Sequence, residues 1–246
     1  MNKISTKPII GIIGVPTYDN EKDNTIAVYN ESKNVTFQKG GIPFMICPLL
    51  NINYYETPLN KIPELTDEEK NIYEEMVDLC DGIIIPGGYR IYEFYKYITE
   101  YAIKKDIPVL GICLGMQTLA SIDNNGNSLE KNEDEFIHTK TKVKYAHSVN
   151  IKKNTLLYDI IKKDKIDVNS KHKYHVSKVN KFKIVATSSD GLIEAIELPK
   201  KRFVLGLQWH PEKMIEYDPD ANKIFDAFFE EINNEKQRTK EKIELL

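Results

Sequence analysis

This 246-residue sequence has no hydrophobic run long enough to cross a bilayer. A transmembrane helix needs roughly 20 consecutive apolar residues, so no membrane partner is expected. The opening residues, MNKISTKPIIGIIG, also lack a long apolar stretch followed by a small-residue cleavage site, which argues against a signal peptide. Basic and acidic residues number 34 and 37, so the charge is nearly balanced. Without a strong positive excess, no nucleic-acid partner is expected either.

Cysteine is scarce, and its three residues are widely separated. An odd number of scattered cysteines does not suit a disulfide framework, and no Cys-x-x-Cys pair offers a zinc site. A reducing cytoplasm is therefore the expected compartment. Cys47 and Cys80 lie among apolar residues, so we expect both to be packed in the interior. His138, His147 and His175 have no ligand-like neighbours at short spacing, so we interpret them as structural or solvated and predict no metal site.

Short apolar runs and amphipathic stretches alternate through the first half of the chain. Such alternation favours parallel strands joined by right-handed helical crossovers. Thr66 before an acidic turn is typical of a helix N-cap. The expected strands are residues 8–14, 42–47, 82–85 and 108–112, and the expected helices are residues 28–39, 66–79, 92–105 and 114–121.

The pattern changes from about residue 143, where short β-like runs follow one another between turns. A final helix is expected from about Asp220, and the charged tail from about residue 231 is expected to be a solvated or frayed helix end. No internal repeat or low-complexity linker divides the chain, which favours one domain over residues 1–246. The expected strands of this half are residues 143–151, 182–186, 193–197 and 203–207.

The sharpest local feature is the run VLGICLGMQ, in which an apolar strand leads through Gly-x-Cys-x-Gly into a helical pattern. This arrangement is typical of a nucleophile elbow, whose tight turn exposes the central side chain above the sheet. Gly111 and Gly115 suit the crowded backbone, and a helix N-terminus at Cys113 favours the reactive thiolate. A small buried cysteine at a strand end explains the motif about equally well.

A histidine and a carboxylate follow a later apolar run, in the sequence VLGLQWHPE. A cysteine nucleophile needs a base within hydrogen-bond reach, and that base needs an acceptor on its other ring nitrogen. His210 and Glu212 point to the same side of an extended backbone, with Pro211 restricting the chain between them. In isolation such a tripeptide is an uninformative loop.

Paired glycines end a third apolar run, IIIPGG. Such a loop can direct backbone N–H groups at a developing oxyanion, although alone it reads as a plain turn. The three features together, in this order, favour a cysteine nucleophile with a His-Glu pair and an oxyanion hole.

Six ordered pieces, IIIPGG, PVLGICLGMQ, HSVNI, VNSKH, SSDGLIEAIE and GLQWHPE, give the chain a family resemblance. It resembles class I glutamine amidotransferase domains, and more closely the peptidase C26 branch of γ-glutamyl hydrolases, which includes enzymes similar to γ-glutamyl-γ-aminobutyrate hydrolase. The resemblance implies an α/β fold: a flavodoxin-like, doubly wound, mostly parallel sheet with additional antiparallel strands in the second half.

The resemblance also implies roles for single residues. Cys113 matches the nucleophile, His210 its general base and acid, and Glu212 the carboxylate that orients His210. The reaction passes through a γ-glutamyl thioester and requires no metal or organic cofactor.

Further family positions concern the oxyanion and the substrate. Gly88 and Leu114 match the positions whose N–H groups form the oxyanion hole, and Gln117 matches a glutamine that holds the γ-glutamyl group. His172 lies in the VNS-x-H motif, where it either lines the substrate pocket or serves as a satisfied loop histidine.

The sequence departs from the family pattern around the expected substrate mouth. Residues 89–93 lead directly into a helix without the usual insertion, and Leu114 stands where many γ-glutamyl hydrolases have Arg. Residues 121–136 replace a Gly-Gly-x-Leu-x-Gln-Asp run, and Lys173 and Tyr174 replace His and Gln. The leaving amine is therefore left open.

The sequence thus predicts a cytoplasmic cysteine amidohydrolase that cleaves the γ-amide bond of a small γ-glutamyl compound or glutamine. Two alternatives stay open: a glutaminase subunit that supplies ammonia to a separate synthase, and a catalytically inactive member with a binding role. Tyr92, Phe94 and Tyr95 share a helix face, and we expect this face to pack in the core. Alternatively, it could cap the site or contact a second subunit, which would make the protein a homo-oligomer.

Overall fold

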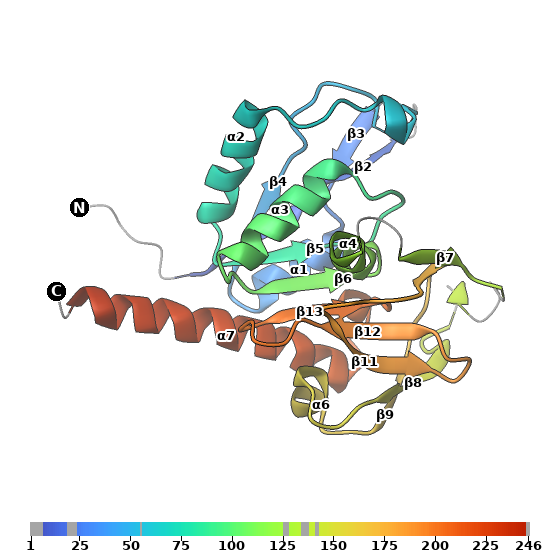
Figure 1. The fold of residues 1–246 in the computed structure, drawn as a ribbon. Coiled ribbons are helices and arrows are strands. Elements are labelled where there is room, and N and C mark those ends of the chain that lie inside the picture. The colour runs from blue at the N-terminus through green and yellow to red at the C-terminus, as the bar shows by residue number, and fades with distance from the viewer. Residues whose placement is uncertain are drawn as a thin grey trace.

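A mixed β-sheet runs through the middle of the molecule, between two layers of helices (Figure 1). The computed structural model describes residues 7–18, 24–54, 56–124, 128–133, 138–140 and 143–244, with side chains to residue 238. One half of the sheet is parallel, and its buried strands read as continuous apolar runs because helices cover both faces. In spatial order these strands are β4 (Ile42–Ile46), β1 (Ile9–Ile13), β5 (Gly82–Ile85), β6 (Val109–Ile112) and β13 (Val204–Leu207).

Antiparallel strands extend the sheet beyond β13. They are, in spatial order, β12 (Ile193–Glu197), β11 (Lys183–Ser188), β8 (His147–Ile151) and β9 (Lys165–Val168). Short β10 (Tyr174–Val176) pairs with β12 and with β7 (Leu129–Lys131), and a separate hairpin joins β2 (Val15–Tyr18) to β3 (Asn24–Ala27).

Each face of the sheet has its own helices and its own apolar cluster. Helices α2 (Asp67–Asp78), α3 (Glu93–Lys104) and α4 (Leu114–Asp123) pack on one face, and α1 (Asn30–Gln38), α6 (Leu156–Ile161) and α7 (Pro219–Glu244) on the other. Short 3₁₀ turns lie at η1 (Leu59–Lys61) and η2 (Pro211–Lys213). This arrangement confirms the predicted α/β fold with its mostly parallel first half and antiparallel second half.

Local sequence patterns predicted the longer helices and strands to within a few residues. Thr66 caps α2 in a full capping box, since it accepts the N–H of Glu69 while the Glu69 carboxylate accepts the N–H of Thr66. The predicted strand at 143–151 begins only at His147. Several short elements were not predicted, each of six residues or fewer: β2 and β3 of the hairpin, α6, β7, β9 and β10. Tyr92, Phe94 and Tyr95 are buried, which confirms core packing for that face of α3.

The charged tail from about residue 231 continues helix α7, and its first two turns also contact the fold. Helix α7 continues to Glu244, and the Ile232 side chain is buried against the sheet. Glu235 pairs with Arg202 at 2.7 Å and Lys236 with Asp81 at 2.8 Å, so charged residues of the tail hold α7 onto the fold. The apolar stripe of α7, with Phe228, ends at Ile232, and the side chains of residues 233–238 are all polar and at least partly exposed.

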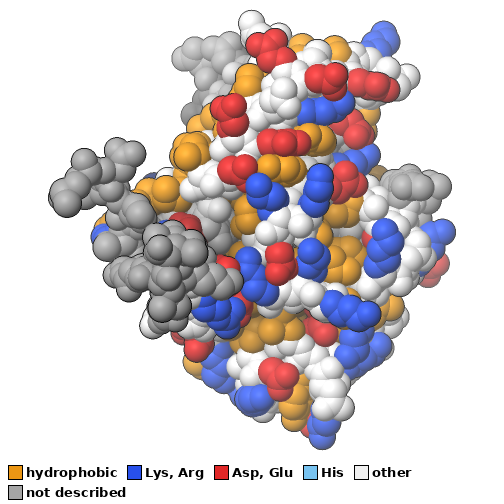
Figure 2. Space-filling view, turned by 60° about the vertical axis from the view of Figure 1, so that its left-hand side comes forward, with side chains coloured by type: hydrophobic (Ala, Val, Ile, Leu, Met, Phe, Trp, Pro, Cys, Tyr) orange, Lys and Arg blue, Asp and Glu red, His pale blue; other side chains and the backbone are white. Residues whose placement is uncertain are grey.

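The surface shows the mixed charge that the composition suggests. On the face drawn in Figure 2, basic and acidic side chains are interspersed, with hydrophobic side chains scattered among them. None of the helices in the described part of the chain combines the length and the apolar composition that crossing a membrane requires.

The close approach of α4 to β5 gives a first prediction. A Cβ atom on Gly115 would lie 2.2 Å from the backbone oxygen of Ile85, so Gly115→Ala must displace one element from the other. We expect it to lower the free energy of unfolding by about 2 kcal/mol or more, measured by urea denaturation. Gly40→Ala is the control, because a Cβ at Gly40 meets open space. Only the positive φ of 86° is unfavourable there, and it should lower the free energy of unfolding by about 1 kcal/mol. Equal losses would contradict the close approach.

Candidate active site

The turn between β6 and α4 places Cys113 in an unusual backbone conformation. Its φ of 53° and ψ of −101° lie outside the regions that a side chain normally allows, which costs of order 1–3 kcal/mol. Gly111 and Gly115 flank the turn, and a Cβ on Gly111 would lie 2.7 Å from the carbonyl carbon of Gly115. A strained turn closed by two required glycines is the nucleophile-elbow geometry that the sequence predicts.

His210 and Glu212 follow β13, the parallel neighbour of β6. Because parallel strands end at the same edge of a sheet, the chain after β13 arrives beside the turn at Cys113. His210 Nδ1 lies 2.7 Å from Glu212 Oε1. A Cβ on Gly87 would lie 2.8 Å from His210 Cε1 and 3.6 Å from Cys113 Cβ, so the ring and the thiol flank one small volume.

The electrostatics of this pair favour a protonated imidazole. Burial lowers the pKa of His210, but the charge of Glu212, the charge of Cys113 and hydrogen bonds to both outweigh burial and raise the pKa well above its ordinary value. The three groups can therefore supply a nucleophile, a proton donor and an orienting carboxylate.

The glycine loop after β5 lies against the start of α4. A Cβ on Gly88 would lie 2.8 Å from Leu114 Cδ2, which places the two predicted oxyanion-hole residues side by side. Leu114 is the first residue of α4, and the first N–H groups of a helix have no partner within it. Its N–H is therefore available to an oxyanion formed at Cys113.

One wall of the site is the segment from residue 169 to residue 174. The Asn169 side chain accepts the N–H of His210 and donates to its carbonyl oxygen, both at 2.8 Å. Lys171 places its carbonyl oxygen 3.9 Å from Cys113 Sγ. Gln117, buried one turn after the cysteine, donates to the carbonyl oxygen of Tyr174 at 2.9 Å and to Gln208 Oε1 at 3.2 Å. The contact of Asn169 with His210 could not be predicted from the sequence, because the two residues lie far apart in the chain.

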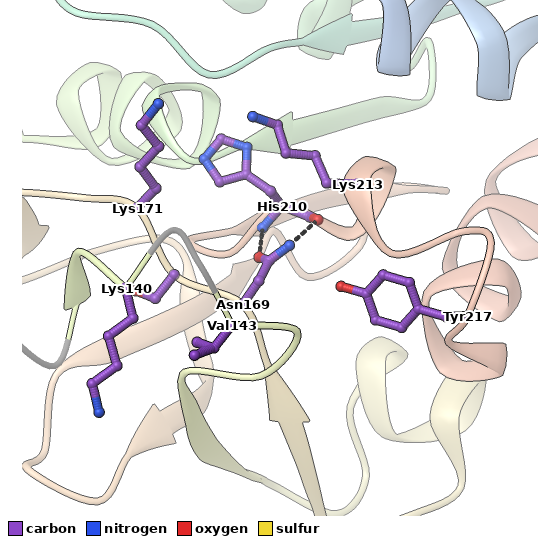
Figure 3. Close-up of a pocket in the computed structure, with 8 residues that line it drawn as sticks. Lys140, Val143, Asn169, Lys171, His210, Lys213 and Tyr217 are labelled. Carbon is purple, nitrogen blue, oxygen red and sulfur yellow. Dashed lines mark hydrogen bonds between the residues drawn. The ribbon is translucent and has the colours of Figure 1, made fainter.

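A cavity of about 310 Å³ opens beside His210 (Figure 3). In this view the Lys171 and Lys213 side chains extend to the same side as the His210 ring, whereas Lys140 points away. The cavity therefore has positive charge beside the His210 ring, which suits a carboxylate-bearing ligand. Its lining residues are Lys140, Val143, Asn169, Ser170, Lys171, His210, Lys213 and Tyr217.

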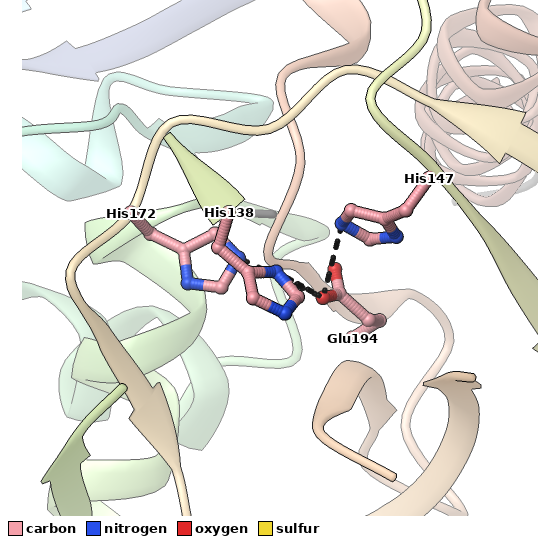
Figure 4. A group of neighbouring side chains, drawn as sticks. All are labelled: His138, His147, His172 and Glu194. Atoms are coloured by element: carbon pink, nitrogen blue, oxygen red, sulfur yellow. Dashed lines mark ion pairs between the residues drawn. The ribbon is translucent and has the colours of Figure 1, made fainter. Parts of the chain in front are cut away.

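His172 does not face this cavity. Its buried ring lies beside His138, with 4.7 Å between ring centroids, and both rings meet the carboxylate of Glu194 (Figure 4). His147 joins the same group. Of the two options predicted for these histidines, structural or solvated, the complete burial of His138 leaves the structural one. The group was not visible in the sequence because its members come from four separate segments.

Other predicted residues are placed as follows. Cys80 is buried as expected, whereas Cys47 is only partly buried. His175 bonds to Asn132 Oδ1 at 3.0 Å. Of the segment that departs from the family pattern, residues 125–127 and 134–136 lie outside the described residues.

Comparisons with known proteins identify the family. The sequence pattern of the family described as peptidase C26 matches residues 92–212, which contain Cys113, His210 and Glu212. A protein of Schizosaccharomyces pombe that carries the name glutamine amidotransferase is 36% identical, over 82% of this chain and 80% of that protein. A glutamine amidotransferase-like protein of Rickettsia prowazekii is 30% identical, over 61% of this chain and 77% of that protein.

Longer relatives and solved structures extend the comparison. The CTP synthase of Methanosphaera stadtmanae is 30% identical over 71% of this chain, but the chain spans only 38% of that synthase. The glutaminase domain of Trypanosoma brucei CTPS with bound acivicin superposes with a TM-score of 0.58 at 19% identity, covering 91% of this chain and 94% of that one. A glutamine amidotransferase of Thermotoga maritima superposes with a TM-score of 0.53 at 18% identity, covering 94% and 97%. At these identities the structural likeness concerns the fold.

The contrast among the three thiols gives a second prediction. Burial, with the charge of Asp81, raises the pKa of the Cys80 thiol to about 12, and burial raises that of Cys47 as well, which keeps both in the unreactive thiol form. A γ-glutamyl diazo-ketone should therefore label Cys113 alone, as read by peptide mass spectrometry. Labelling of Cys47 or Cys80 in place of Cys113 would overturn the assignment of the nucleophile.

The 2.7 Å contact between His210 and Glu212 gives a third prediction. Glu212→Gln keeps the shape of the side chain but removes the charge that raises the pKa of His210. We expect kcat to fall roughly 10²–10⁴-fold, the usual range for acid–base catalysis, with an unchanged far-ultraviolet spectrum. A folded variant with wild-type turnover would remove Glu212 from the site.

Proposed function

This chain belongs to the class I glutamine amidotransferase family, in its peptidase C26 branch, and on that premise we propose that it is a free-standing cysteine amidohydrolase. Its substrate would be a small γ-glutamyl compound, and the bond cleaved would be the γ-amide. The observation that carries the proposal is the strained Cys113 turn beside a buried ion pair of His210 with Glu212. These are the parts that nucleophilic catalysis at an amide requires.

The proposed reaction has two halves. The Cys113 thiolate attacks the γ-carbonyl carbon, and the N–H groups of Gly88 and Leu114 stabilise the oxyanion that forms. His210 gives its proton to the departing nitrogen as the C–N bond breaks, which leaves a γ-glutamyl thioester on the cysteine. Water then loses a proton to His210 and attacks the thioester carbon. Glutamate leaves and the thiolate returns.

Charge beside the site supports an anionic substrate. Lys171 and Lys213 line the cavity on the side of the His210 ring, where they can pair with the α-carboxylate of a γ-glutamyl group. Gln117 lies one turn beyond the nucleophile and is proposed to act on the same group through its carbonyl oxygen, since its amide nitrogen is already bonded. The proposed setting is the cytoplasm, in keeping with three free cysteines.

A second candidate function rests on the CTP synthase relatives. This chain matches 38% of the length of the Methanosphaera stadtmanae synthase. A glutaminase subunit that releases ammonia to a separate synthase would use the same residues at the same positions. The two functions differ in one measurable property, because a partner-dependent glutaminase is nearly silent alone.

The fourth prediction separates these functions. Purified protein is assayed for amine release from L-glutamine, γ-glutamyl-γ-aminobutyrate, γ-glutamyl-putrescine and a γ-glutamyl anilide. We expect at least one γ-glutamyl amine to be turned over without a partner. Cys113→Ala should lose that turnover by on the order of 10³-fold or more, because it removes the nucleophile. Silence of the wild type across the whole panel would contradict the free-standing hydrolase and favour the partner-dependent glutaminase.

A further inference from the structure

Three histidines and one glutamate meet outside the cavity described above (Figure 4). Glu194 Oε1 lies 3.6 Å from His138 Nδ1, 3.5 Å from His147 Nε2 and 3.6 Å from His172 Nε2. One ligand atom from each of the four residues can be chosen so that all lie within 4.8 Å of one another. Glu194 and His138 are fully buried, and the other two side chains are at most 5% exposed.

These inward-facing atoms have no hydrogen-bond partner. His138 Nδ1, His147 Nε2, His172 Nε2 and both carboxylate oxygens of Glu194 are buried without one in the described part of the chain. The separations of 3.5–3.6 Å exceed the usual 2.7–3.2 Å of an N–H···O hydrogen bond. Burying a polar atom without a partner is costly, and a whole group of such atoms facing one point indicates that something is to be bound there.

The outer nitrogens of the rings, in contrast, are held. His138 Nε2 lies 2.8 Å from Asp190 Oδ2, and His172 Nδ1 lies 3.1 Å from the carbonyl oxygen of Tyr174. His147 Nδ1 is 3.3 Å from the carbonyl oxygen of Ser148. Each of these acceptors favours a proton on the outer nitrogen, which leaves a lone pair on the inner one. At His172 Nδ1 the amide nitrogen of Asn132 is also near, at 3.4 Å, but the carbonyl oxygen is the closer partner. Metal-binding histidines are oriented in this way by their outer partners.

We propose that His138, His147, His172 and Glu194 bind one transition-metal ion, with Zn²⁺ the best fit. Imidazole and carboxylate ligands suit zinc, at about 2.0–2.2 Å from the metal. Four ligands at that distance in a tetrahedron lie about 3.3–3.6 Å apart. The three separations measured from Glu194 Oε1 agree with that edge length. This inference departs from the sequence-based expectation of no metal.

Charge at the group fits a cation as well. Neutral imidazoles and one carboxylate are ligands that zinc accepts, and the carboxylate brings a negative charge that a divalent ion would offset.

The ion would serve the active site through position. Four protein ligands complete a tetrahedron and leave no place for a reactive water, so the site is structural in character. His172 directly follows Lys171, whose carbonyl oxygen faces Cys113 Sγ. The carbonyl oxygen of Glu194 accepts the N–H of Gln208, two residues before His210. A bound ion would therefore tie together the segments that carry both sides of the catalytic pair.

The fifth prediction tests the ion directly, without substrate. Chelator-treated full-length protein is titrated with Zn²⁺ or Co²⁺, and bound metal is measured after desalting by elemental mass spectrometry. We expect one equivalent per chain, and at 100 times the dissociation constant a rise in Tm of about 5–10 °C. Bound Co²⁺ should show the visible bands of a tetrahedral site, without the intense near-ultraviolet band of a thiolate ligand.

Variants then locate the ion. Glu194→Gln and His147→Gln should each weaken binding by more than the roughly 10–100-fold that loss of an outer partner costs. His175→Gln is the matched control, since this histidine bonds to Asn132 and lies outside the group. Cys113→Ser should also bind metal as the wild type does, which separates this site from the nucleophile.

Three results would overturn the inference. They are less than half an equivalent of metal in the wild type, a thiolate band in the Co²⁺ spectrum, or unchanged affinity in folded Glu194→Gln. If that variant does not fold, the stoichiometry and spectrum of the wild type still decide. Metal binding with no amidase activity would leave this inference standing while the proposed function fails, and the reverse result would do the opposite.

Discussion

The structure depends on one constraint, the closeness with which α4 leaves the end of β6. The backbone of Gly115 runs so near Ile85 that no side chain fits between them. That approach forces Cys113 into a positive φ and directs the chain into a helix at once. The turn keeps its strained conformation because the surrounding strands β5, β6 and β13 are buried throughout and hold it in place.

The same sheet edge explains why the site assembles from distant parts of the sequence. β5, β6 and β13 are parallel neighbours, and each ends in a loop that carries one part of the site: the glycine pair, the cysteine, and the His-Glu pair. A parallel sheet gathers the carboxyl ends of its strands, so ligands bind there in doubly wound folds. The antiparallel half adds a fourth part of the site, the segment that follows β9, where Asn169 hydrogen-bonds to the backbone of His210.

Much of the architecture follows from short-range signals. Some patterns indicate a structure from neighbouring residues alone: the capping box at Thr66, the apolar runs of the buried strands and the glycines around Cys113. The major elements were therefore predictable to within a few residues. The short strands β7, β9 and β10 were not, because they owe their conformation to pairing partners rather than to their own pattern. The ion pairs of the tail were not predictable either, because their partners lie on other elements, as Asp81 does for Lys236.

By itself, the sequence determined the chemistry that this protein can offer: the cysteine at a turn, the His-Glu pair and the glycines that flank them, because spacing along a strand or a turn fixes such neighbours. Only the tertiary structure decided which scattered residues meet. It turned His172 away from the cavity and brought it to His138, His147 and Glu194, which lie in separate segments of the sequence. Long-range contacts of this kind are set by strand order and loop path, and those are settled by packing of the whole sheet rather than by any local pattern.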